Sequence, residues 1–263
     1  MNNIKLVYIN INKNFRNAKE LKSAFITTII GMNINNIFYL AIWYYFGRMV
    51  GTINGWKPVD IFGLYAFSST SYGFIQSIFS GVYNIPSYIS TGNLDKYLLT
   101  PKSILLKIAT SDISINAFGD LFFGFMCFSL YIFLANLSFM QILLSIFLII
   151  TSSMVYFAFS LVCMSISFYL MDGENISQGL KNTFLCVSLY HGGVFTGVLR
   201  VFFTFVIPSL LLGAVPVEII KTTSLVNFCL IFISTVFWLV LAIVFFYQSL
   251  KKYESNNFFG FGY

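Results

Sequence analysis

The chain has 263 residues, of which 58% are hydrophobic and only 9% are charged, with a mean hydropathy of +0.83. A soluble globular domain carries about 25% charged residues, so this composition excludes a chain that covers itself with a hydrated surface. At this length we expect one polytopic, all-α membrane domain and almost no soluble domain. The four cysteines have no CxxC spacing, which argues against a metal site or a disulfide framework.

Uncharged runs indicate the membrane spans, since a span needs about 20 mostly apolar residues. The first is expected at residues 23–47 and the second at residues 61–83, before the breaker Asn84-Ile85-Pro86. The uncharged stretch from residue 121 to residue 171 is long enough for two spans, folded at Ala135-Asn136-Leu137-Ser138. We therefore predict a third span from about Ile113 and a fourth over residues 139–168.

The last third of the chain is harder to divide. Residues 175–190 predict a fifth span that Gln178 and Lys181 weaken, and residues 222–250 predict a clear sixth. Between them, residues 194–217 are apolar but interrupted by a charge, two prolines and a glycine. Such a segment is either a broken span or a pair of short helices that dip into the membrane as a re-entrant hairpin.

The basic residues predict the topology, because Lys and Arg accumulate in short cytoplasmic loops. With the N-terminus inside, eleven basic residues fall on the cytoplasmic side: Lys5, Lys13, Arg16, Lys19, Lys22, Lys96, Lys102, Lys107, Lys181, Lys251 and Lys252. Four fall outside: Arg48, Lys57, Arg200 and Lys221. We expect both termini in the cytoplasm. The net charge of +6 then marks orientation and contact with anionic lipids, and nothing supports nucleic-acid binding.

Residues 1–22 precede the first span and carry apolar side chains at helical spacing, at Ile4, Tyr8, Ile11 and Phe15. This pattern suits an amphipathic helix that lies on the cytoplasmic leaflet. The alternative is a frayed, Asn-rich tail. The permease domain proper would occupy residues 23–263.

The connection over residues 84–110 is long for a compact bundle. Gly92 can end one helix, Asn93 can cap the next, and Pro101 can end it. The result would be a short exposed helix with Leu94, Leu98 and Leu99 on one side and Asp95 and Lys96 on another. Such a helix could pass force to a soluble partner, although an ordinary connecting loop fits the pattern equally well.

Three patches resemble bacterial ABC exporter permeases of the ABC type 2 superfamily, in the branch of roughly 260 residues. Residues 92–101 read GNLDKYLLTP, which resembles the family's G-E-L-D-x-x-L-L-x-P segment. Residues 247–255, YQSLKKYES, are similar to its G-L-x-x-Y-E-S ending, and residues 199–208, LRVFFTFVIP, to its L-R-x-x-L-T-F-x-I-P pattern. Asn93 departs from the usual acid, and Tyr190-His191-Gly192-Gly193 stands where the family commonly has Tyr-Pro.

The resemblance implies a half-transporter with six spans, a cytoplasmic coupling helix near residues 95–99 and an outer re-entrant hairpin near residues 200–216. Two such subunits, identical or paralogous, would form the pathway above two separate ATPase subunits. The chain lacks a G-x-x-x-x-G-K-[ST] loop, so ATP and Mg would be bound by the partner ATPase and no cofactor or metal by this chain. We expect the protein to be located in a bacterial cytoplasmic (inner) membrane. The implied ATPase-coupling interface comprises Gly92, Asp95, Lys96, Tyr97, Leu98, Leu99 and Pro101.

Charged groups in membrane spans are costly and are candidates for function. Asp120 falls inside the third span and could pair with a Lys or line the path, whereas Asp60 and Asp112 are expected at solvated membrane edges. For Arg200 a structural role in the hairpin is as plausible as substrate contact. Asn33 and Asn36 lie on one face of the first span, where they could line a cavity or bond to a neighbouring helix. The candidate translocation path is therefore Asn33, Asn36, Asp120 and Arg200.

Two other classes of function compete with the exporter subunit. An ion-coupled carrier or channel acting without an ATPase would place several ionisable groups at mid-membrane, and here only Asp120 is a plausible deep acid. A membrane-embedded enzyme would need clustered His, Asp or Glu, and the chain has one histidine and nine scattered acids. The substrate class stays open among lipids, peptides, antibiotics and other amphipathic compounds.

Overall fold

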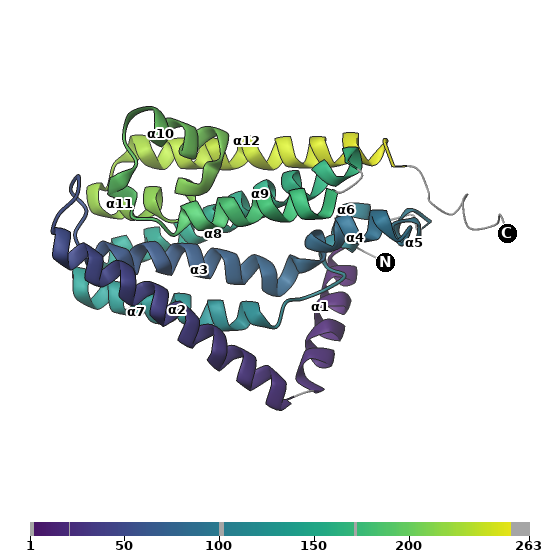
Figure 1. The fold of residues 1–263 in the computed structure, drawn as a ribbon, viewed down its shortest axis with the longest axis horizontal. Helices are drawn as coiled ribbons and strands as arrows, with labels where there is room; N and C mark the ends of the chain where they lie inside the picture. The colour runs from purple at the N-terminus through teal and green to yellow at the C-terminus, as the bar shows by residue number, and fades with distance from the viewer. Residues whose placement is uncertain (1–2, 21, 100–102, 171–172, 254–263) are drawn as a thin grey trace.

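The structure is a computed structural model that describes residues 3–20, 22–99, 103–170 and 173–253. Its regular secondary structure in these ranges is helical, apart from a single bridge between Ile53 and Trp56, and short turns and loops join the helices. The long helices lie side by side, and shorter helices collect at both ends of the bundle (Figure 1). We call these the α5 end, which carries α4, α5 and α6, and the α11 end, which carries α10 and α11.

Six helices run along the bundle: α2 (Lys22–Val50), α3 (Asp60–Phe79), α7 (Asn116–Ala135), α8 (Phe139–Ser165), α9 (Gly173–Ser188) and α12 (Leu225–Leu250). Four segments in the described part are long and apolar enough to cross a membrane, those in α2, α7, α8 and α12. The 16 residues of α9 are too few for the same criterion. The predicted second and fifth spans therefore form helices at the expected places, with less apolar character than the other four.

Helix α3 lies at the centre of the bundle and is buried along most of its length. It packs against α7, α8 and α11, so its Ser68-Ser69-Thr70-Ser71 run faces protein. Polar groups in a membrane-embedded helix require such neighbours. The central position of α3 explains how a helix with a modest apolar content packs inside the bundle.

Helix α12, in contrast, turns apolar side chains outward. Leu230, Ile233 and Phe237 are exposed, whereas Ser234 and Thr235 are buried against the bundle. A helix with this division of side chains suits contact with lipid on its outer face.

The predicted turn of the chain between the third and fourth long apolar segments is confirmed at residues 135–138. Asn136 adopts a left-handed backbone conformation (φ 51°) at the end of α7, a conformation that Asn tolerates better than most residues. Ser138 then caps α8, since its hydroxyl accepts from the Gln141 N–H while the Gln141 side chain accepts from the Ser138 N–H at 2.8 Å.

Helix α1 (Asn3–Glu20) forms over the predicted amphipathic segment and runs across the α5 end of the bundle (Figure 1). Asn10 donates to the Thr110 hydroxyl (3.0 Å) and Asn14 to the Thr110 carbonyl (3.2 Å). Phe15 packs on Phe118 at the start of α7, with ring centroids 5.7 Å apart. These contacts hold α1 against the bundle while Tyr8 stays exposed.

Three short helices occupy the α5 end: α4 (Ile85–Ser90), α5 (Asp95–Leu98) and α6 (Ile104–Ala109). The 3₁₀ turn Ser80–Asn84 joins α3 to α4. At the other end, a 3₁₀ turn (Gly192–Val194) leads into α10 (Gly197–Val201) and a π-type turn (Phe202–Val206). A second 3₁₀ turn (Pro208–Leu211) then leads to α11 (Ala214–Thr222). Residues 194–217 thus form short helical pieces that are interrupted at Pro208, and both predicted alternatives, a broken span and a re-entrant hairpin, agree with this secondary structure.

Helices α3 and α7 approach closely because glycines stand at their contact. A Cβ atom at Gly73 would lie 2.7 Å from the backbone nitrogen of Leu121, closer than real Cβ contacts allow. A Cβ atom added at Gly31 on α2 would have no neighbouring atom within 4 Å. Small residues at such contacts allow helix backbones to pack directly in membranes.

We predict that Gly73→Ala destabilises the folded chain by about 1–3 kcal/mol, the usual cost of forcing extra volume into a packed core. Gly31→Ala is the matched control and is expected to be neutral or slightly stabilising, because alanine favours a helix. Thermal unfolding of the purified chain in detergent measures both. Equal melting temperatures for the two variants would contradict the α3–α7 packing.

Candidate functional site

Three polar residues predicted to line a path meet at one place, between α2 and α7. The Asn36 Nδ2 donates to Asp120 Oδ1 at 2.7 Å. One turn earlier on α2, the Asn33 Nδ2 donates to the carbonyl of Gly119 at 3.3 Å and to that of Ile29 at 2.8 Å. Asp120 is only 5% exposed, and its second carboxylate oxygen has no hydrogen-bond partner. The predicted pairing of Asp120 with a lysine is absent from the described residues.

A cavity of about 160 Å³ adjoins Asp120 and Asn36. Helices α2, α3, α7 and α9 contribute its walls, which include three tyrosine rings and three serines: Tyr39, Tyr65, Tyr72, Ser68, Ser69 and Ser188. The lining includes no Lys or Arg. Sequence reasoning did not find these α3 and α9 residues, because their convergence depends on tertiary packing alone.

Helix α9 exposes a polar side that runs along the bundle. Its exposed polar residues include Glu174, Asn175, Asn182 and Thr183, and the apolar Ile176 and Leu180 are exposed among them. The opposite side packs inward through Ser177, Phe184 and Ser188, all buried. The polar residues recur at helical spacing, and this periodicity was a signal in the sequence that the prediction of a plain fifth span overlooked.

Lys181 and Gln178, which weaken the fifth span in the sequence, are both partly buried on α9. The Lys181 ammonium lies over the ring of Tyr83, 4.8 Å from its centroid. A cation against an aromatic face in a desolvated setting is stabilised by the ring quadrupole. Lys181 was counted among the cytoplasmic loop charges, but its side chain packs within the bundle.

The predicted coupling segment is anchored to the bundle at several points. Leu94 is fully buried in the main hydrophobic core, and Gly92 turns the chain with a left-handed φ of 69°. The rings of Tyr88 and Tyr97 lie 5.2 Å apart, and the Lys107 ammonium donates to the Tyr97 carbonyl at 3.1 Å. Burial raises the pKa of Tyr97 to about 12, so its phenol is neutral at physiological pH. These contacts fix α5 firmly to the ends of the long helices.

Two predictions about this segment need correction. Leu94 does not share an exposed side with Leu98 (40% exposed) and Leu99 (84% exposed), because it turns into the core. Asn93 does not cap α5, since its amide donates to the Thr91 hydroxyl (2.8 Å) and its carbonyl accepts from Lys96 (2.6 Å). The first depends on the tertiary packing of Leu94, whereas the Asn93 contacts are local, to residues two and three positions away. Pro101 lies outside the described residues.

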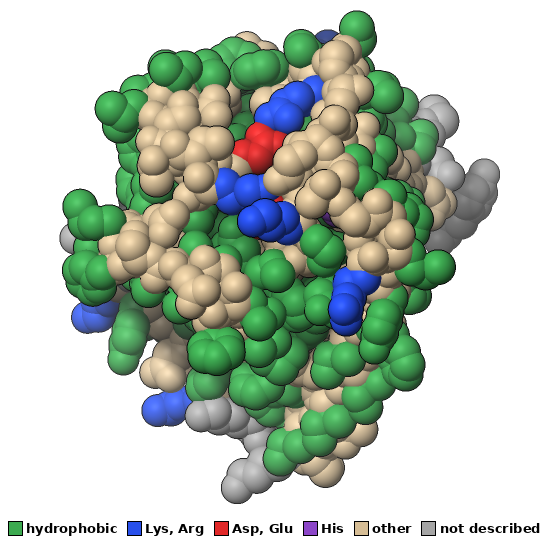
Figure 2. Space-filling view, turned by 90° about the vertical axis from the view of Figure 1, so that its left-hand side faces the viewer, with side chains coloured by type: hydrophobic (Ala, Val, Ile, Leu, Met, Phe, Trp, Pro, Cys, Tyr) green, Lys and Arg blue, Asp and Glu red, His purple; other side chains and the backbone are tan. Residues whose placement is uncertain are grey.

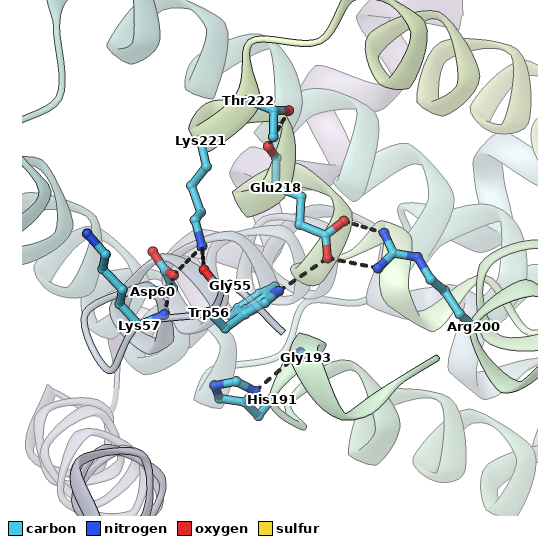
Figure 3. Close-up of polar contacts among 10 residues, drawn as sticks. All are labelled: Gly55, Trp56, Lys57, Asp60, His191, Gly193, Arg200, Glu218, Lys221 and Thr222. Atoms are coloured by element: carbon cyan, nitrogen blue, oxygen red, sulfur yellow. Dashed lines mark hydrogen bonds and ion pairs between the residues drawn. The ribbon is translucent and has the colours of Figure 1, made fainter. Parts of the chain in front are cut away.

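At the α11 end a network of charges joins three segments of the chain (Figure 3). Lys221 donates to Asp60 and to the Gly55 carbonyl, each at 2.6 Å. Glu218, one turn before Lys221, forms an ion pair with Arg200 and accepts from the Trp56 indole at 3.2 Å. Basic and acidic side chains consequently gather in the middle of this end of the molecule (Figure 2).

Asp60 is therefore not a solvated edge carboxylate, as the sequence suggested, but a buried one (5% exposed). It accepts from the backbone N–H of Lys57 (2.7 Å) as well as from Lys221. It is the first residue of α3, and its place at a membrane edge stays a prediction. The partner lies 161 residues away in sequence, so no local pattern could reveal it.

His191 and the two glycines after it support this network. The His191 ring packs on Trp56 with centroids 5.2 Å apart, and its Nδ1 accepts from the Gly193 N–H at 3.2 Å. Burial lowers the pKa of His191, which favours the neutral imidazole that this hydrogen bond requires. A Cβ at Gly192 would lie 2.2 Å from the Trp56 ring, so only glycine fits.

Arg200 stands apart from the other three predicted path residues. Its guanidinium is engaged by Glu218 at the α11 end, and its side chain is 45% exposed. Its position in α10 thus favours the structural role in the hairpin that the sequence left open. The other three lie together on α2 and α7.

The bundle of long apolar helices with short helices at both ends defines a multi-pass helical membrane protein. A family model described as ABC-2 family transporter protein matches residues 30–257. The chain belongs to this family, whose members are the membrane components of transporters that work with ATPase subunits. Comparisons with curated proteins and with solved structures gave no match.

We predict that Lys221→Gln destabilises the chain, because it leaves the buried Asp60 without its cation. Removing one partner of a buried pair costs about 3–5 kcal/mol, and the 26% exposure of the Lys221 side chain places the expected loss near the lower value. Lys57→Gln is the control, since Lys57 reaches Asp60 through its backbone, and a change within about 0.5 kcal/mol is expected. Thermal unfolding in detergent compares them. A Lys57→Gln loss as large as that of Lys221→Gln would contradict the pairing.

Proposed function

We propose that this chain is the transmembrane permease subunit of an ATP-driven exporter in a bacterial cytoplasmic membrane. In this proposal α2, α3, α7, α8, α9 and α12 are its six spans. The observation that carries the proposal is α5, a short helix that is anchored to the core by Leu94 yet presents Leu98 and Leu99 to solvent. Two adjacent exposed leucines on a turn held by a buried neighbour offer an apolar surface that a soluble partner can bind.

Charge supports a cytoplasmic position for the α5 end. Most of the basic residues lie at this end of the bundle, in α1, α5, α6 and the residues after α12. At the α11 end the ion pairs with Glu218 and Asp60 engage Arg200 and Lys221. Positive charge that is not matched by acids retains a loop on the cytoplasmic side. Both termini would then lie in the cytoplasm, with α1 on the inner leaflet.

The proposed partners at the α5 end are two ATPase subunits that bind ATP and Mg. ATP-driven closure of an ATPase pair would move α5, and the core contact of Leu94 would transmit that movement to the long helices. The Tyr88–Tyr97 contact and the Lys107–Tyr97 hydrogen bond keep α5 from bending independently. Rigid linkage of this kind is what a coupled conformational change requires.

The polar side of α9 supports a second permease subunit. Exposed Asn182 and Thr183 at membrane depth would be poorly solvated by lipid, unlike the apolar outer side of α12. A second copy facing α9 would cover this side and enclose a polar pathway between the two subunits. We propose an identical copy, with a paralogue as the other arrangement.

Residues 194–217 would form an outer re-entrant hairpin over this pathway. The break at Pro208 and the short lengths of α10 and α11 prevent either helix from crossing a bilayer. The Arg200–Glu218 ion pair joins the two arms. The proposed cargo is an amphipathic compound such as a lipid, a peptide or an antibiotic.

An ion-coupled carrier is the second candidate function, and Asp120 is the observation that favours it. A buried carboxylate with one free oxygen could bind a transported ion or proton. The two candidates differ in their need for an ATPase.

We predict that replacing both Leu98 and Leu99 with Asp abolishes ATPase binding without unfolding the chain, because both side chains are exposed. Each lost apolar anchor costs about 1–2 kcal/mol, so the ATPase recovered per tagged permease should fall by roughly tenfold or more. Co-purification from the native host measures this ratio, and Val198→Asp, exposed at the opposite end, is the control. If wild-type chain recovers no ATPase and transports alone under an ion gradient, the exporter proposal is wrong.

A further inference from the structure

Asp120 has an unfilled position beside it. Of its two carboxylate oxygens, Oδ1 is bonded to Asn36 (2.7 Å) and Oδ2 has no partner, although the residue is 95% buried. A buried carboxylate oxygen without a hydrogen bond carries the full cost of its desolvation.

The adjoining cavity is lined by groups that can bind a cation, namely a carboxylate and tyrosine side chains. The Tyr65 hydroxyl, also without a partner, lines the cavity together with Asp120. Tyr39 and Tyr72 contribute further aromatic side chains, and no lysine or arginine supplies a counter-charge. A carboxylate and aromatic rings around one space are the groups that stabilise an organic cation.

The volume limits what can enter. At about 160 Å³ the cavity is smaller than the roughly 300–1,000 Å³ of pockets that enclose drug-sized ligands. It can take an ammonium group with its nearest substituents, and a longer apolar part would have to extend beyond the cavity. Small inorganic cations fit less well, because Ca²⁺ requires six to eight oxygen ligands and Mg²⁺ a near-ideal octahedron.

We propose that Asp120 and the tyrosines of α2 and α3 form a binding subsite for the ammonium group of a cationic amphipathic compound. The identification of this compound as transported cargo rests on the proposed exporter function, whereas its binding does not. The Asp120 carboxylate supplies the counter-charge. The rings of Tyr72 and its neighbours replace part of the cation's hydration shell.

The test measures binding to the purified full chain in an uncharged maltoside detergent, without any ATPase. The probe is benzyltrimethylammonium, and neopentylbenzene is its neutral isostere of the same shape. Thermal unfolding at increasing probe concentration reports the apparent Kd, since a ligand that binds only the folded state stabilises it. We expect saturable stabilisation by the cation alone.

Asp120→Asn retains an acceptor for Asn36 and removes the charge, so we expect the apparent Kd of the cation to rise at least tenfold. Asp112→Asn, outside the cavity, is the matched control and should leave the Kd unchanged. A second pair of variants serves if Asp120→Asn fails to fold. Tyr72→Leu should weaken binding of the cation several-fold, and Tyr72→Phe should retain the binding because it keeps the ring.

Three results would overturn the subsite. The first is equal stabilisation by the neutral isostere, and the second is unchanged cation affinity in both Asp120→Asn and Tyr72→Leu. The third is stabilisation by sodium chloride but not by the probe at equal ionic strength. The last would indicate an inorganic cation site instead. None of them bears on ATPase binding, which the co-purification measures separately.

Discussion

Lipid cannot hydrogen-bond to polar side chains, and this constraint accounts for the arrangement of the whole bundle. The serines and threonine of α3 avoid lipid because α7, α8 and α11 surround that helix. Those of α12 avoid it by turning inward. Helix α9 exposes Asn175, Asn182 and Thr183 beside the apolar Ile176 and Leu180, and we propose that another protein or water covers this side.

The two ends of the bundle are built in different ways, and this difference suits their proposed roles. The α11 end is joined by charge, since Glu218 and Asp60 tie three segments together through Arg200, Trp56 and Lys221. The α5 end is held by apolar burial and ring packing, and it leaves two leucines exposed. In the proposed orientation the charge-linked α11 end would face outward and the exposed leucines of the α5 end would face the ATPase subunits.

Local sequence signals predicted a large part of this structure. Apolar runs placed the long helices, and the turn near Asn136 and the helix end near Gly92 were predicted from residue type alone. The sequence could not predict contacts between distant segments. Asp60 was expected to be solvated because its cation, Lys221, lies at the other end of the chain. The cavity beside Asp120 was missed for the same reason, since four helices converge on it.

The central claim is that the polar side of α9 faces a second permease subunit. Two native cysteines allow this claim to be tested by cross-linking. Cys186 on α9 and Cys229 on α12 are both exposed, whereas Cys127 and Cys163 are buried. The measurement is cross-linking with a short bismaleimide in native membranes, using Cys229→Ser to isolate Cys186 and Cys186→Ser to isolate Cys229. The account predicts a cross-linked pair of permease subunits from Cys186 and none from Cys229. Efficient cross-linking through Cys229 with none through Cys186 would contradict it.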